Sequence, residues 1–392
     1  MKEAEALRPL LMEEIDITKE PEDEKILELI DHLILEEEIT RRLPVKRKLE
    51  VRQELFYSVR RLDVLQELLD DPEVTEIMVN GCDTIFAEKH GKIFHYEKKF
   101  TSREKLEDII QQIAGSCNRV VNEQNPIVDA RLENGDRVNA VLRPVALNGP
   151  ILTIRRFPER PITMAQLIAG NCISREAADF LKDMVRAGYS ILVGGGTSTG
   201  KTTFLNALSS CIPPGERIIT IEDNAELQIQ GIENLVRLEA RETHLEGQQS
   251  ITIRELIRTS LRMRPSRIII GEVRGAEAWD FLQALNTGHS GSLGTAHANS
   301  TKDMIGRLEA MVLMGMELPP EAIRRQIVSG IEILVHLERD VDGKRHVEEI
   351  SEIDGICDGT IGIHPLFQWE PRKGLMPCGT IKNRKKLERL RS

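Results

Sequence analysis

Apolar residues recur along this chain with two different spacings, and the change between them divides the sequence. In the first part the positions i, i+3, i+4, i+7 and i+8 are apolar, namely Ile26, Leu29, Ile30, Leu33 and Ile34. This spacing predicts a helix with one apolar face, and a second such helix is expected over residues 55–69. From residue 74 onward, short apolar runs are separated by turn residues, which is typical of strands.

Residues 73–157 are expected to form a small α+β domain. Strands are predicted at 74–79, 84–88, 129–132, 137–142 and 151–154, with a helix around 106–113. Asn80-Gly81 and Asn134-Gly135 are turn sequences of the kind that joins antiparallel strands. The preceding residues 1–72 are then a charged helical extension, and the proline-bounded segment 157–161 is a linker.

The next part of the chain alternates apolar strands with helices. Strands are predicted at 191–193, 217–221, 235–238 and 267–270, and helices at 204–208, 251–263, 277–285 and 301–314. Such continuous apolar runs are typical of a parallel sheet that is buried on both faces. We therefore expect an α/β domain over residues 158–345. Residues 288–299 read as a glycine- and hydroxyl-rich segment between two helices, and residues 346–392 as a charged, turn-rich tail without an assigned role.

Composition narrows the class of protein. The chain of 392 residues is 40% hydrophobic and 30% charged, and its net charge of −10 argues against a general nucleic-acid-binding protein. We find no apolar run of about 18 residues and no signal-peptide pattern at the N-terminus. Six scattered cysteines without a C-x-x-C pair indicate reduced thiols. A cytoplasmic protein is therefore expected.

A phosphate-binding loop is predicted between the strand at 191–193 and the helix at 204–208. The loop and the start of its helix read Gly195, Gly196, Thr197, Ser198, Thr199, Gly200, Lys201, Thr202 and Thr203. Glycines let the backbone N–H groups point inward, and a helix N-terminus attracts anions. Lys201 is expected on the β- and γ-phosphates of ATP, and the Thr202 hydroxyl on Mg²⁺.

Two carboxylates and a histidine are candidates for the chemistry. Glu222 and Glu272 each follow a predicted strand, where open α/β sheets place their ligands. Either acid could hold Mg²⁺ or accept a proton from the attacking water, although each alone could equally cap a helix. His297 could donate to the γ-phosphate, but a lone histidine is more often structural.

Arginines form a third group of candidates, because a γ-phosphate approached from a neighbouring subunit requires their fork of donors. Arg237 and Arg241 follow the first acidic site. Arg254, Arg258 and Arg262 lie four residues apart on one predicted helix. For that stripe, a solvated or salt-bridged surface is as plausible as a role in the site.

Four sequence blocks together resemble the secretion ATPase superfamily of type II secretion, type IV pili and type IV conjugation. The blocks are the Walker A loop at 195–202, an Asp box at 221–227, a Walker B region at 260–275 and a His box at 287–300. The sequences of these blocks are most similar to those of Tad/Flp pilus assembly ATPases of the CpaF type. The upstream segments Asp129-Ala130-Arg131-Leu132 and Arg137-Val138-Asn139-Ala140 contribute to this resemblance.

The resemblance implies a homohexamer whose subunits carry a PAS-like N-terminal domain and a RecA-like P-loop domain. It also implies that ATP and Mg²⁺ bind between these domains and that the ring acts on an inner-membrane platform protein. By this resemblance, arginines on the N-terminal side reach ATP, and the candidates are Arg131, Arg137, Arg143 and Arg155. The enzyme would be an ATPase at the inner face of the cytoplasmic membrane, with no direct contact to nucleic acid.

The sequence departs from the family at Ser198, where a glycine is usual, so a left-handed backbone there is expected to cost a little energy. Gly271 stands where many P-loop enzymes have the Walker B aspartate. Alternatives to the pilus motor are a conjugation or effector-secretion ATPase, a nucleotide-gated scaffold with little turnover, and a nucleic-acid motor. The net charge and the lack of interleaved aromatic and basic residues count against the last.

Overall fold

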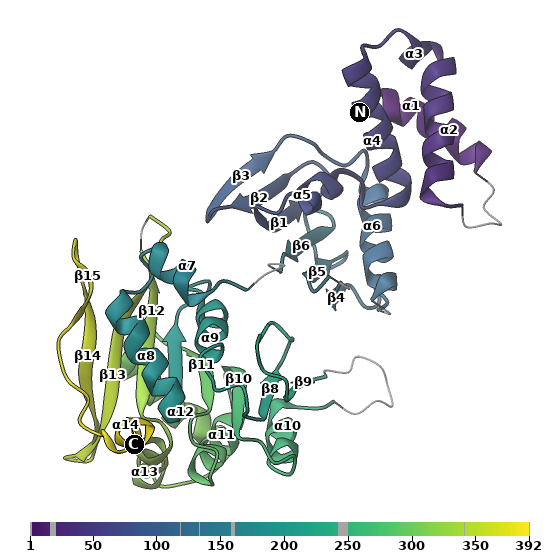
Figure 1. The fold of residues 1–392 in the computed structure, drawn as a ribbon. Coiled ribbons are helices and arrows are strands. Elements are labelled where there is room, and N and C mark those ends of the chain that lie inside the picture. The colour runs from purple at the N-terminus through teal and green to yellow at the C-terminus, as the bar shows by residue number, and fades with distance from the viewer. Residues whose placement is uncertain are drawn as a thin grey trace. The chain divides into compact units, whose positions relative to one another are not determined.

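The computed structural model describes residues 2–15, 21–117, 119–132, 134–157, 161–241, 250–340 and 342–391. The chain forms two compact units, residues 1–158 and residues 159–392 (Figure 1). The expected linker spans 157–161, and its residues 158–160 lie outside the described part.

Helices make up the first part of the N-terminal unit. They are α1 (Lys2–Glu14), α2 (Asp23–Glu36), the short α3 (Glu38–Arg41) and α4 (Val45–Arg60). The apolar faces of α1, α2 and α4 meet in one core that includes Leu7, Ile30 and Leu55. The expected helix at 26–34 is thus confirmed as α2. The single helix expected at 55–69 is wrong, because α4 ends at Arg60 and a 3₁₀ turn, η1 (Asp63–Leu65), precedes α5 (Gln66–Asp70). Asp63 has a left-handed φ of 53°, which a continuous helix does not allow.

The rest of this unit is a six-stranded antiparallel sheet in the order β3-β2-β1-β6-β5-β4. Its strands are β1 (Val74–Asn80), β2 (Ile85–Lys89), β3 (Lys92–Tyr96), β4 (Ile127–Arg131), β5 (Arg137–Val141) and β6 (Ile151–Arg155). Helix α6 (Arg103–Ser116) begins at Ser102, whose hydroxyl accepts a hydrogen bond from the Lys105 N–H. Its apolar side packs into the core with Ile77, Val138 and Ile154 of the strands. Only β3 was not predicted, since four of its five residues are exposed and lack an apolar alternation.

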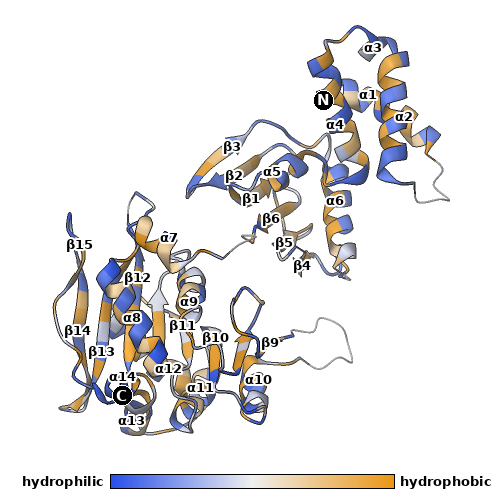
Figure 2. Ribbon diagram, viewed as in Figure 1, coloured by the Kyte–Doolittle hydropathy of each residue, from blue (hydrophilic) through white to orange (hydrophobic). Residues whose placement is uncertain are grey.

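The C-terminal unit is built on a mixed nine-stranded sheet in the order β15-β14-β13-β12-β7-β11-β10-β8-β9. Six strands are parallel: β7 (Ile191–Gly195), β8 (Ile218–Glu222), β9 (Leu235–Glu239), β10 (Arg267–Val273), β11 (Leu293–His297) and β12 (Ile333–Arg339). One core joins one face of the sheet to α7 (Met164–Ala169), α8 (Arg175–Ala187) and α9 (Lys201–Ser209). A second core joins the other face to α10 (Ile253–Ser260), α11 (Glu277–Asn286), α12 (Thr301–Leu313) and α13 (Pro320–Gly330). Figure 2 shows the apolar, orange positions on the strands between these helices.

One prediction about this unit is wrong, and some strands of its sheet were not predicted. The expected turn-rich tail forms β13 (Arg345–Cys357), β14 (Thr360–Glu370), β15 (Gly374–Pro377) and α14 (Lys385–Arg391). These antiparallel strands extend the sheet, and their residues Val347, Ile350 and Phe367 are buried in its core. The segment expected as a glycine- and hydroxyl-rich connection contains β11. Its small residues fit there because a Cβ on Gly294 would lie 3.2 Å from the Phe281 ring.

Candidate active site

The predicted phosphate loop lies at the carboxyl end of β7. Strand β7 ends at Gly195 and α9 begins at Lys201, so the nine residues 195–203 comprise the last residue of β7, the loop and the first turn of α9. The first N–H groups of a helix have no partner within the helix, so they are available to an anion. The structure therefore brings the loop residues together in a turn whose N–H groups suit an anion.

The backbone of the loop is tightly constrained. Gly195 approaches β12 so closely that a Cβ on it would lie 2.6 Å from the Leu337 carbonyl oxygen. Ser198 has a φ of 59° and Gly200 a φ of 92°. The expected left-handed conformation of Ser198 is thus confirmed, at a cost of about 1 kcal/mol for a residue with a side chain. The Thr199 hydroxyl donates to the Gly196 carbonyl at 3.0 Å and supports the turn.

Lys201 folds back over the loop. Its Nζ donates to the carbonyl oxygens of Gly195 at 3.1 Å and Gly196 at 2.8 Å, and it lies 3.4 Å from Nδ1 of His297. The side chain is nearly buried. An ammonium group held at the mouth of the loop is well placed to exchange these partners for phosphate oxygens.

Glu272 and His297 form a pair beside Lys201. Nε2 of His297 lies 2.7 Å from Oε1 of Glu272, and the two residues come from the ends of the adjacent parallel strands β10 and β11. Burial lowers the pKa of His297, and the charges of Lys201, Arg307 and Arg274 add to the effect. A neutral imidazole can then accept from Lys201 at Nδ1 while Nε2 faces the Glu272 carboxylate.

Glu222 lies at the end of β8 and is almost completely buried. Its Oε2 accepts hydrogen bonds from the N–H groups of Glu226 at 2.7 Å and Leu227 at 2.8 Å. Burial raises the pKa of Glu222 to about 7, against the opposing effects of these two N–H groups and of Arg237. A Cβ on Gly271 would lie 2.9 Å from Cγ of Glu222, so the Glu222 side chain fills the space next to that glycine.

The site contains groups that fit a magnesium ion. Oε1 of Glu222 is buried and accepts no hydrogen bond among the described residues. Because Glu222 lies against Gly271, it offers a carboxylate next to the position that lacks the usual Walker B aspartate. Thr202 stands in the first turn of α9 and supplies a hydroxyl. Carboxylate and hydroxyl oxygens are ligands that Mg²⁺ accepts, usually together with water and phosphate oxygens.

Two of the predicted arginines belong to the β9 side of this unit. Arg237 is on β9, where its Cα is paired with that of Thr220, and its charge acts on Glu222. Arg241 follows β9 and exchanges backbone hydrogen bonds with Ile251. Both are exposed.

Two of the three stripe arginines lie on α10, which ends at Ser260 before Arg262, and these two have a structural explanation. Nε of Arg254 lies 2.6 Å and Nε of Arg258 lies 2.8 Å from the two oxygens of Asp280 on α11. These contacts support the interpretation of the stripe as a salt-bridged surface.

The predicted arginines of the N-terminal unit form a row across its sheet. The Cα atoms of Arg131 on β4, Arg137 on β5 and Arg155 on β6 are paired in register. Directly paired residues present their side chains on the same face. The neighbouring row, which includes Val138 and Ile154, is buried against α6, so the arginines lie on the opposite face. Arg143 is exposed and lies outside the row, after β5.

Arg274 was missed by the sequence analysis. Its guanidinium contacts Asp223 and lies 3.8 Å from Oε2 of Glu272, so it links the acid that follows β8 to an acid near the end of β10. The available signal was its position two residues after Glu272, since residues i and i+2 of a strand share a face.

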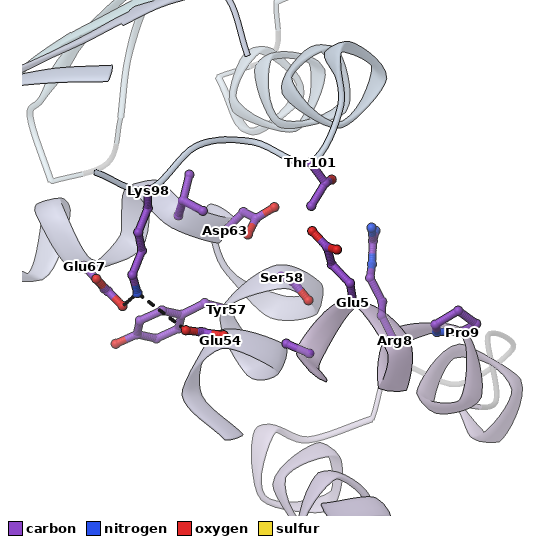
Figure 3. Close-up of a pocket in the computed structure, with 12 residues that line it drawn as sticks. Glu5, Arg8, Pro9, Glu54, Tyr57, Ser58, Asp63, Glu67, Lys98 and Thr101 are labelled. Atoms are coloured by element: carbon purple, nitrogen blue, oxygen red, sulfur yellow. Dashed lines mark hydrogen bonds and ion pairs between the residues drawn. The ribbon is translucent and has the colours of Figure 1, made fainter. Parts of the chain in front are cut away.

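The N-terminal unit holds a separate cavity of about 200 Å³ between α1, α4 and the 63–67 segment. Figure 3 shows the charged side chains that line it, among them Glu5, Arg8, Glu54, Asp63, Glu67 and Lys98. Lys98 forms ion pairs there with Glu67 and, at 3.8 Å, with Glu54. None of the predicted site residues lines this cavity.

The geometry of the C-terminal unit defines a P-loop nucleotide hydrolase, with a phosphate loop, a lysine and two acids at the carboxyl ends of parallel strands. The sequence profile of the family described as "Type II/IV secretion system protein" matches residues 60–356. The chain belongs to this family of secretion ATPases, and it is an ATP hydrolase.

Several relatives extend over most of the chain. A Mycobacterium tuberculosis protein whose name proposes a role in conjugal transfer is 36% identical over 294 residues, 74% of this chain and 83% of that protein. The type IV secretion system protein PtlH of Bordetella pertussis is 34% identical, covering 75% of this chain and 95% of its own length. VirB11 of Brucella suis, also a type IV secretion system protein, is 33% identical, and the match covers 74% of this chain and 88% of that protein.

Solved structures share the fold at lower identity. The pilus retraction motor PilT with bound ADP has a TM-score of 0.54 at 20% identity, covering 76% of this chain and 83% of that one. The ATPase DotB of Yersinia pseudotuberculosis has a TM-score of 0.56 at 19% identity, covering 76% of this chain and 79% of that one. No helix in the described part of this chain has the length and apolar composition to cross a membrane.

Proposed function

We propose that this ATPase powers a type IV secretion or conjugal-transfer machine. The observation that carries the proposal is the extent of the similarity to PtlH and VirB11, both named as type IV secretion proteins, over about three quarters of the chain. The nucleotide site supports it, because a P-loop with two nearby acids is suited to repeated hydrolysis rather than to nucleotide-gated assembly alone.

In the proposed reaction, Lys201 and the N–H groups of the loop bind the β- and γ-phosphates of ATP. Thr202 and Glu222 would hold the magnesium ion, which neutralises charge on the phosphate oxygens. Glu272 would accept the proton of the attacking water, since a carboxylate at a strand end is available as a base. His297, through its 2.7 Å contact with Glu272, would orient that carboxylate and respond to the γ-phosphate.

The proposal includes a homohexameric ring of subunits with PAS-like and RecA-like domains. Arg143, Arg155, Arg237 and Arg241 are exposed, as residues that complete a site in a neighbouring subunit must be. An arginine supplied in this way can stabilise charge that develops in the transition state. The ring would work in the cytoplasm on a platform protein of the inner membrane, without direct contact to nucleic acid.

A second candidate function is assembly of a Tad/Flp pilus, which the sequences of the four motif blocks favour. The two functions separate in the organism of origin if the chromosomal gene is replaced by the Lys201→Ala variant. Loss of protein or DNA export with normal surface pili is expected from the first proposal. Loss of pili with normal export would contradict it and support the second.

A further inference from the structure

The phosphate loop has different neighbours on its two sides. Strand β7 lies between β11 and β12 in the sheet, and all the parallel strands end at the same edge. On the β11 side this edge carries His297, Glu272 and Glu222. On the β12 side it carries Arg339, the last residue of β12, and Arg345, the first residue of β13.

The arginine side packs directly against the loop. Leu337 of β12 is paired with Gly195 of β7, and Arg339 follows two residues later. Arg345 is the register partner of Arg339 across the β12–β13 pair. A Cβ on Gly200 would lie 3.6 Å from Cδ of Arg345, so the stem of this arginine contacts the residue that immediately precedes Lys201.

The charges of these residues favour an anion at this place. Like charges directly opposite one another on neighbouring strands are destabilising. Arg345 is exposed, and no carboxylate of the described residues lies within ion-pair distance of its guanidinium. An anion bound next to the loop would satisfy the guanidinium of Arg345.

We propose that Arg345 binds the α-phosphate of the nucleotide, from the same subunit as the phosphate loop. This rests on the assignment of ATP to the loop. The γ-phosphate must face the acids and His297 on the β11 side, so the chain of phosphates leaves the loop toward β12 and β13. The α-phosphate keeps its charge while the γ-phosphoryl group is transferred, so Arg345 contributes to nucleotide affinity and not to the chemical step.

The test measures the Kd values of the full chain for ADP and ATP by competition with a fluorescent ADP analogue. Arg345→Ala should weaken ADP and ATP binding by the same factor, about tenfold or more, as for loss of a charged hydrogen bond. Its kcat at saturating ATP should remain within about twofold of the wild type. Lys344→Ala removes the same charge from the adjacent exposed residue and serves as the matched control, with unchanged Kd values.

Further arms separate the alternatives. Arg345→Lys should recover part of the affinity, and GDP should lose affinity as ADP does. Loss for ADP without loss for GDP would place Arg345 on the base and overturn the phosphate assignment. An unchanged ADP affinity, or a fall in kcat alone, would overturn the proposal as well. Failure of the wild type to bind any nucleotide would instead contradict the assignment of ATP to the loop.

Discussion

The two sides of β7 carry opposite chemistry around one phosphate loop. The β11 side gathers carboxylates and a histidine, with Glu272 2.7 Å from His297 and Glu222 buried beside Gly271. The β12 side carries two arginines in register. Acids are needed where water is activated, and cations where charge is only held. The difference indicates that the β11 side is the chemical side of the loop and the β12 side is its binding side. Mutations on the two sides should therefore affect hydrolysis and nucleotide affinity separately.

The largest effect is expected at the residue between the two sides. Lys201→Ala should remove binding and hydrolysis together, because a single ammonium group holds the β- and γ-phosphates. By analogy with charge contacts in other P-loop enzymes, the rate should fall by about 10³-fold or more. Steady-state phosphate release and ADP titration measure both losses. Wild-type turnover in a clean preparation would disprove the assignment of the loop.

A comparably large effect is expected from an arginine that neither side of β7 supplies. Arg143→Ala or Arg241→Ala should each reduce the rate by up to about 10³-fold if that arginine reaches the site of a neighbouring subunit. Mixing such a variant with Lys201→Ala should restore part of the activity, because some sites would then combine an intact loop with an intact arginine. Mass measurements must show that the subunits exchange. If no arginine variant recovers activity, all of them act within their own subunit or outside the site.

A change confined to the chemical side should leave binding intact. Glu272→Gln keeps the shape of the side chain but removes the base, so kcat should fall about a hundredfold while the Kd for ATP stays near the wild-type value. Single-turnover kinetics and nucleotide titration measure the two quantities. Glu222→Gln is the comparison: if it, and not Glu272→Gln, shows this pattern, the two acids have exchanged their roles.

The smallest effect is expected from a substitution at Gly271, which packs against Glu222 on the β11 side. Gly271→Ala would place a Cβ 2.9 Å from Cγ of Glu222 and displace that carboxylate, which should lower kcat by about tenfold or less and destabilise the fold by about 1–3 kcal/mol. Gly306→Ala is the matched control, because nothing lies within 4 Å of its added Cβ. Denaturant titration and kcat are the measurements. A Gly271→Ala enzyme with wild-type values of both would show that Glu222 does not need its observed position.

Most of the fold could be predicted where its signal lies within a few neighbouring residues. The apolar period of α2, the capped helix α6 and the apolar run of β10 all follow from local patterns. Strand β11 could not be found in this way, because its glycine and alanine are depleted in strands, and it lies in the sheet between β7 and β10. Strands β13 and β14 could not be found either, because charged residues are interspersed among their buried ones and the burial follows no regular alternation.

For the site, the sequence by itself determined the phosphate loop, since strand, glycines, lysine and helix are contiguous in the chain. It also placed Glu222 and Glu272 at strand ends. Only the tertiary structure decided that Glu222 fills the space beside Gly271, that His297 contacts Glu272, and that Arg345 reaches Gly200. Each of these contacts depends on which strands are neighbours and in which register, and strand pairing is set by burial over the whole sheet rather than by local sequence.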